Sequence, residues 1–147
     1  MGLRRKAREC ALQMLFQWDI THDSVEQIVG TFWEMHDEQS ELRGFAEVLF
    51  HGAVEHVEEA DRIIQRHAEN WRLDRMTTVD RNLLRLAVYE FWVEKETPKT
   101  IIINEAIEIA RRFSSQESPQ FINGILDSIK KELDTGIQEA SGRKPEG

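Results

Sequence analysis

The chain has 147 residues, of which 40% are hydrophobic, and a formal net charge of −8. This length suits one domain, or two small subdomains that share a core, and the apolar content excludes a wholly disordered chain. A single cysteine excludes an internal disulfide and a zinc site built from two thiolates, and it favours a cytoplasmic location. With only three prolines and eight glycines, long stretches are free of helix breakers, which predicts an all-α fold.

The first eight residues carry four positive charges, at Arg4, Arg5, Lys6 and Arg8, and no negative charge. Without these four, 15 basic residues stand against 27 acidic ones, so the rest of the chain carries about −12. A cationic patch on an acidic body indicates a localised anionic partner. Phosphate is the obvious candidate because a guanidinium group can donate two parallel hydrogen bonds to it.

The first helix is predicted from apolar residues that recur at intervals of three and four over about 18 positions. On its other side, Arg5 and Arg8 are expected to share a surface with Leu12 and Phe16. Cations beside an aromatic ring are typical of sites for single-stranded nucleic acid, whose unpaired bases stack on the ring. A frayed basic terminus that only aids solubility remains the alternative. The core stripe comprises Leu3, Ala7, Cys10, Ala11, Met14, Leu15 and Trp18.

The same N-terminal segment does not fit a signal peptide or a membrane span, because polar residues interrupt its apolar positions. No later run approaches the roughly 18 apolar residues that a membrane span needs. We therefore expect a protein that is neither exported nor inserted in a membrane. The interrupting residues are Glu9, Gln13, Gln17 and Asp19.

Five or six further helices are predicted, joined by short loops. Residues 25–33, 40–53 and 57–67 have amphipathic spacing, and residues 79–93 have almost no polar face, which indicates the central helix of the core. Pro98 and Pro119 stand at the first positions of the last two helices, where proline is tolerated. Residues 135–147 lack apolar periodicity and are predicted to form a disordered tail.

No sequence pattern supports catalysis, so we expect no enzyme, cofactor or metal site. The five histidines include no pair at the i, i+4 spacing that places two ligands on one helical face. A glycine-rich phosphate loop is absent from the sequence, and no serine lies in a nucleophile elbow. Cys10 lies on the apolar stripe and is interpreted as a buried packing residue.

Four segments of the chain stand out as motifs. They are Arg4–Gln13 (RRKARECALQ), Thr78–Arg81 (TVDR) with Leu84–Glu90 (LRLAVYE), Pro98 with Ile103–Ala110 (INEAIEIA), and Phe121–Asp127 (FINGILD). In this order, covering residues 4 to about 133, they resemble the bacterial NusB family of transcription antitermination factors. The resemblance implies no catalysis and an all-α fold of six or seven helices. It also implies one domain over residues 1–134, made of two packed helical subdomains over about 1–70 and about 71–134.

The resemblance also implies the partners. Members of this family bind the boxA segment of nascent, single-stranded RNA together with ribosomal protein NusE. The pair then joins other Nus factors on RNA polymerase and suppresses termination, especially in ribosomal RNA operons. Some relatives dimerise, so the sequence leaves a homodimer open, and a dimer that buried the basic helix would hide the RNA site.

Site residues follow from the resemblance motif by motif. Phe16 replaces a frequent tyrosine, which removes a hydroxyl donor but keeps the stacking plane, and Gln120 replaces a common lysine, which removes one phosphate charge. Asn104 is expected to have a structural role, and Gly124 is expected to allow close helix approach. RNA contacts are expected from Arg4, Arg5, Lys6, Arg8 and Phe16, RNA or NusE contacts from Asp80, Arg81, Gln120 and Phe121, and NusE pairing from Glu117.

Two alternatives come from other functional classes. NusB-like helical domains also precede a class of ribosomal RNA methyltransferases, so the chain could be the RNA-recruiting domain of an RNA-modifying enzyme. The sequence contains no methyl-donor fold, which favours a free-standing factor. A purely protein-binding helical scaffold is the other alternative, and it predicts no RNA affinity even when NusE is present.

Overall fold

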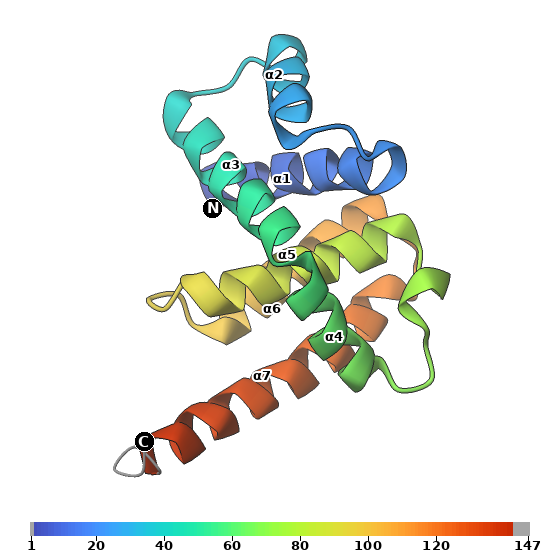
Figure 1. Ribbon diagram of the computed structural model, residues 1–147, viewed down its shortest axis with the longest axis vertical. Helices are drawn as coiled ribbons and strands as arrows, with labels where there is room; N and C mark the ends of the chain where they lie inside the picture. The colour runs from blue at the N-terminus through green and yellow to red at the C-terminus, as the bar shows by residue number, and fades with distance from the viewer. Residues whose placement is uncertain (1, 143–147) are drawn as a thin grey trace.

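The computed structural model describes residues 2–142, with side chains through residue 136. Within this range all regular structure is helical, which confirms the all-α prediction (Figure 1). No described helix combines the length and the apolar character needed to cross a membrane. The elements are α1 (Gly2–Thr21), α2 (Val25–Met35), α3 (Ser40–Glu55), α4 (Val57–Ala68), the 3-10 turn η1 (Leu73–Arg75), α5 (Thr78–Val93), α6 (Lys99–Phe113) and α7 (Ser118–Gly142).

Helix α5 is the central helix, as the sequence predicted, since it packs against α1, α3, α4, α6 and α7. The Thr77 side chain caps its first turn by accepting a hydrogen bond from the backbone N–H of Asp80. Leu84 and Val88 of this helix have no exposed surface. A helix surrounded by neighbours needs apolar residues on nearly every side, which explains its weak polar face.

Two groups of helices meet at α5. Figure 1 shows α1, α2 and α3 gathered on one side of it, with α4, α6 and α7 around the rest. Helix α4, which was expected to belong to the N-terminal subdomain, packs against α5 and α7 as well as α3. Because α1 and α3 both contact α5, one continuous apolar core runs through both groups.

A glycine allows close helix approach at Gly52 rather than at Gly124. A Cβ atom at Gly52 of α3 would overlap the ring of Tyr89 on α5. Gly124 has open space where its Cβ would be, so the prediction made for it is wrong. The reason is orientation: Ile125 and Leu126 point into the core, whereas Gly124 lies on the exposed side of α7.

Helix α7 continues to Gly142, past Leu133, where the apolar spacing ends. Between Leu133 and Pro145 the chain contains no proline, so no proline forces the helix to stop earlier. Residues 143–147 of the predicted tail lie outside the described residues.

Candidate nucleic-acid interface

Helix α1 is covered on more than one side, because α2, α3 and α5 all pack against it. The predicted core stripe is buried from Ala7 to Leu15, and its end residues Leu3 and Trp18 are partly buried. Arg8 and Leu12 are buried as well, at only 7% and 4% exposed. The prediction that these two share an open surface with Phe16 is therefore wrong. Apolar spacing identified one buried stripe, and it could not show that a further helix covers the opposite side.

Arg8 is held inside the protein by two carboxylates. Its Nε lies 3.0 and 3.1 Å from the two carboxylate oxygens of Glu90 on α5, and Nη2 donates a further hydrogen bond to the same group. Its Nη1 lies 3.7 Å from Glu105 on α6. Glu90 is only 2% exposed, so its charge depends on this guanidinium for compensation.

Arg5 combines a fixed position with partial exposure. Its Nε and Nη2 donate to the two carboxylate oxygens of Glu105 at 2.8 and 2.9 Å. These hydrogen bonds hold the pKa of the Glu105 carboxyl below its usual value and raise the pKa of Arg5. The Arg5 side chain remains 32% exposed, and three of the five guanidinium N–H donors are not used by Glu105.

Arg4 and Lys6 are more exposed, at 54% and 58% of their side-chain surfaces. Arg4 Nη1 lies 3.2 Å from Glu94, and its guanidinium carbon lies 4.4 Å from the centre of the Phe45 ring. Lys6 Nζ lies 3.1 Å from Glu38, which raises the pKa of Lys6. We refer to Arg4, Arg5 and Lys6 as the basic edge.

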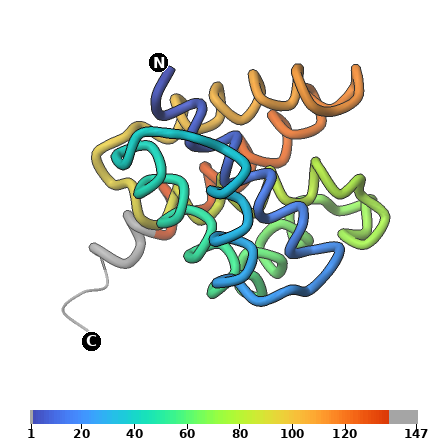
Figure 2. The backbone as a smooth tube through the Cα atoms, turned by 90° about the horizontal axis from the view of Figure 1, so that it is seen from above, coloured from blue at the N-terminus to red at the C-terminus, as the bar shows by residue number. Residues whose placement is uncertain are grey.

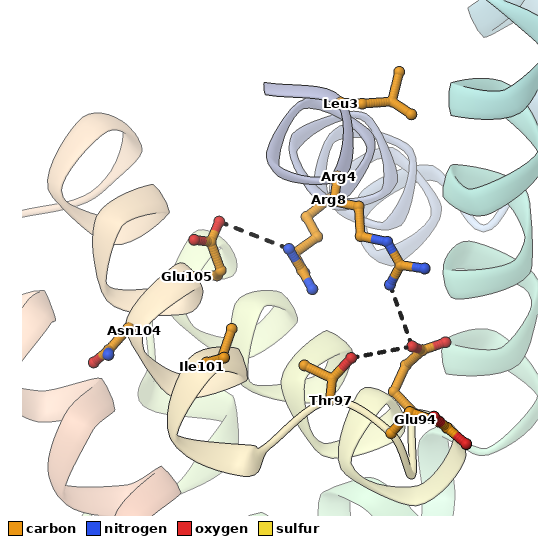
Figure 3. A pocket seen from close by; sticks show the side chains of 9 residues that line it. Leu3, Arg4, Arg8, Glu94, Thr97, Ile101, Asn104 and Glu105 are labelled. Carbon is orange, nitrogen blue, oxygen red and sulfur yellow. Dashed lines mark hydrogen bonds and ion pairs between the residues drawn. The ribbon is translucent and has the colours of Figure 1, made fainter. Parts of the chain in front are cut away.

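A groove of about 700 Å³ adjoins the basic edge, between the start of α1, the α5–α6 loop and α6. Figure 2 shows the first turns of α1 beside the beginning of α6. In Figure 3, Arg4 and Arg8 reach from α1 toward the carboxylates of Glu94 and Glu105. The groove is lined by Leu3, Arg4, Arg8, Glu94, Glu96, Thr97, Ile101, Asn104 and Glu105, and Asn104 is exposed on it.

Phe16 lies on the same side of α1 as Arg5, three turns further along, and is 37% exposed. The α1 and α5 helices run antiparallel, since Arg8 contacts Glu90 whereas Asp19 contacts Arg81. The basic edge therefore lies beside the C-terminal end of α5. Phe16 lies further along α1, toward the level of the start of α5.

Asp80, a predicted contact residue, is only 6% exposed. Its carboxylate accepts hydrogen bonds from the hydroxyls of Ser114 at 2.6 Å and Ser118 at 2.9 Å. These bonds tie the start of α5 to the loop between α6 and α7.

Arg81 is also engaged within the protein. Its Nε donates to Asp19 at 3.0 Å, and its Nη1 donates to the backbone carbonyls of Leu73 and Met76. Burial opposes ionisation of Asp19, but hydrogen bonds from Asn82 and Arg81 hold the pKa of this carboxyl below its usual value.

The remaining predicted residues lie at the start of α7, beside a hollow of about 380 Å³. Glu117 and Gln120 are exposed, and Phe121 packs edge-on against Trp71 with ring centres 5.6 Å apart. Trp71 is 56% exposed and was not predicted, because it lies in an irregular segment without periodicity. The signal available in the sequence was a tryptophan in a segment between two predicted helices. The hollow is lined by Trp71, Arg75, Met76, Thr77, Asp80, Ser115, Glu117, Ser118 and Phe121.

The predicted residues thus do not form one exposed surface. Arg8, Asp80 and Arg81 are engaged by partners within the protein. The basic edge and Phe16 lie on α1, and the remaining residues lie beside the hollow at the start of α7. The pairing carboxylates Glu38, Glu90 and Glu94 were not predicted, since helical spacing does not show which distant carboxylate an arginine meets. No group of three or more potential metal ligands occurs among the described residues.

Comparisons with known proteins agree with this architecture. The NusB family model matches residues 5–131. The chain is 56% identical over 141 residues to the transcription antitermination protein NusB of Koribacter versatilis, covering 95% of this chain and 97% of that protein. It is 47% identical over 135 residues to the protein of the same name from Solibacter usitatus, covering 90% and 92%.

Solved structures show the same similarity. The structure of T. maritima NusB has a TM-score of 0.79 and 38% identity, and the match covers 88% of this chain and 91% of that one. A crystal structure of the antitermination factors NusB and NusE in complex with double-stranded RNA has a TM-score of 0.82 and 28% identity, covering 90% and 98%.

Proposed function

The chain belongs to the NusB family, and we propose that it is a transcription antitermination factor that binds boxA RNA together with ribosomal protein NusE. With other Nus factors it joins an antitermination complex on RNA polymerase, especially on ribosomal RNA operons. The proposal includes a cytoplasmic location, because nascent RNA is the ligand, and no catalytic step. The observation that carries it is the basic edge, which presents three partly exposed cations on a helix anchored in the core.

Solvent exposure separates the residues proposed to contact RNA from those proposed to support them. Arg4, Arg5 and Lys6 would bind phosphates, and Phe16 would stack on an unpaired base. A helix anchored along its buried side keeps these groups in place before RNA arrives, which lowers the ordering cost of binding. Arg8 is buried beneath them, and we propose that it holds the helix rather than touching RNA.

The hollow beside α7 is the proposed NusE surface. It combines the exposed ring of Trp71 with Phe121 and the exposed carboxylate of Glu117. Aromatic anchors next to a polar rim are typical of protein interfaces. Gln120, exposed on the same turn, is proposed to face RNA or NusE, whereas Asp80 would hold the adjoining loop in place.

The test is a titration of fluorescein-labelled boxA RNA, read by fluorescence anisotropy at several salt concentrations, with and without NusE. Three phosphate contacts predict a slope of log affinity against log salt near −2, from about −0.7 per contact on single strands. Arg4→Ala combined with Lys6→Ala should make the slope shallower by about 1.4. Glu117→Arg should reduce the affinity gained on adding NusE.

Lys131→Ala is the matched control, because Lys131 is a 75% exposed cation paired with Asp127 on α7, away from α1. It should leave the slope unchanged. An unchanged slope in the Arg4 and Lys6 double variant would exclude the basic edge as the phosphate site. Absence of RNA binding even with NusE would favour the purely protein-binding scaffold.

A further inference from the structure

Every basic residue at the start of α1 is paired with a carboxylate from another part of the fold. The partners come from the α2–α3 loop, from α5 and its C-terminal end, and from α6. Carboxylates from other elements of the fold thus neutralise the cations of the candidate RNA site. The pairs are Arg4 with Glu94, Arg5 with Glu105, Lys6 with Glu38, and Arg8 with Glu90.

Two of these ion pairs are costly to break. The carboxylates of Glu90 and Glu105 are 3% and 7% exposed, and each accepts two or more hydrogen bonds from one guanidinium. Moving Arg8 or Arg5 away would leave a buried charge without its partner, which is strongly unfavourable. Arg5 therefore keeps Glu105 while its remaining N–H donors stay free for another acceptor.

The other two ion pairs are easier to break. Arg4 and Lys6 each meet their carboxylate through one nitrogen, at 3.2 and 3.1 Å, with more than half of the cationic side chain in solvent. The carboxylate of Glu94 is 25% exposed and also accepts a hydrogen bond from the Thr97 hydroxyl at 3.4 Å. If Arg4 leaves, Glu94 therefore keeps one partner and contact with water. The Glu38 side chain is 19% exposed. Because the cation of each pair lies largely in solvent, these pairs contribute less to stability than the two buried pairs.

We propose that Glu38 and Glu94 stand in for RNA phosphates on the free protein, and that RNA binding exchanges carboxylate for phosphate at Lys6 and Arg4. Arg5 and Arg8 keep their own carboxylates throughout. The inference rests on the RNA-binding function proposed above. Breaking each carboxylate pair offsets part of the binding free energy that the new phosphate contact supplies. The two carboxylates therefore lower the affinity for any phosphate chain. Only an RNA that makes further contacts, such as stacking on Phe16, then binds tightly.

The experiment measures boxA RNA affinity of Glu38→Gln and Glu94→Gln by anisotropy in the presence of NusE. Each variant should bind about two- to fivefold more tightly than the wild type, the range expected for loss of one exposed ion pair. Asp37→Asn and Glu41→Gln are the matched controls, since they remove the same charge from exposed positions close to Glu38 in the sequence and outside the groove. Among the described ion pairs, Arg4 and Lys6 meet Glu94 and Glu38, not these neighbours. The controls should change affinity by less than about 1.5-fold.

A double-mutant cycle tests whether the pair itself is responsible. In an Arg4→Ala background, Glu94→Gln should no longer raise RNA affinity. Equal gains in the controls, or a gain that persists without Arg4, would overturn the exchange and indicate a general effect of net charge. If wild-type protein binds boxA RNA but the two glutamine variants bind no better, the exchange alone is wrong. If wild type does not bind, the proposed function itself fails.

Discussion

Arg8 of α1 and Glu90 of α5 lie 82 positions apart in the sequence and form a buried ion pair, with side chains only 8% and 3% exposed. Nε and Nη2 of the arginine both donate to the carboxylate. Helix α1, which carries the basic edge, is thereby fastened to the central helix. The most basic segment of the chain is an integral part of the fold and not a loose extension of it.

Removal of Arg8 should destabilise the protein strongly, because Glu90 would stay buried without a counter-charge. We expect Arg8→Ala to lower the free energy of unfolding by about 3–5 kcal/mol, measured by urea denaturation. Lys6→Ala is the comparison, because Lys6 is 58% exposed, and it should leave the urea midpoint almost unchanged. Equal effects of the two substitutions would show that Arg8 is as accessible as Lys6 in solution.

The two glycines Gly52 and Gly124 should respond in opposite directions to replacement by alanine. Gly52→Ala places a methyl group against the Tyr89 ring, and overpacking of this kind costs about 1–3 kcal/mol. Gly124→Ala adds a methyl group in open space within a helix and should stabilise by about 0.5–1 kcal/mol. Thermal unfolding followed by circular dichroism would show both shifts. A stable Gly52→Ala protein would mean that the Tyr89 ring turns aside without loss.

Glu105 should make the protein sensitive to acid. Its folded pKa is depressed by the hydrogen bonds from Arg5, so its contribution to stability is complete above the unfolded value of about 4.3. That contribution is lost as the pH falls through the lower folded pKa. The difference in unfolding free energy between wild type and Glu105→Gln should therefore be largest near neutral pH. It should shrink steadily below about pH 4, and a difference independent of pH would contradict the assignment.

Cys10 should be chemically inert in the folded protein. Burial raises the pKa of its thiol to about 11, and the residue is 4% exposed. Because the thiolate is the reactive form, labelling by a thiol reagent near pH 8 should be slow in the native state. In urea the same thiol should react at the rate of an ordinary cysteine. Fast labelling of the native protein would indicate that α1 opens away from its neighbours.

Local signals in the sequence were sufficient for the helices. Pro98 marks a helix start that the structure keeps within one residue, and the nearly apolar pattern of residues 79–93 predicted the central position of α5. Signals of this kind depend only on residues within one or two helical turns, so they can be read from a short stretch of sequence. The family motifs led to the same fold, and the comparisons confirmed it.

The state of the individual site residues was not predictable in this way. Arg5 and Arg8 are both arginines on one helix, yet one is a third exposed and the other is buried. The difference arises from α5 and α6, whose carboxylates reach α1 from about 80 and 100 positions away. The sequence by itself determined that this chain is a helical protein with a concentrated cationic start. Only the tertiary structure decided which of those cations face solvent, because exposure and ion pairing depend on neighbours that helical spacing cannot identify.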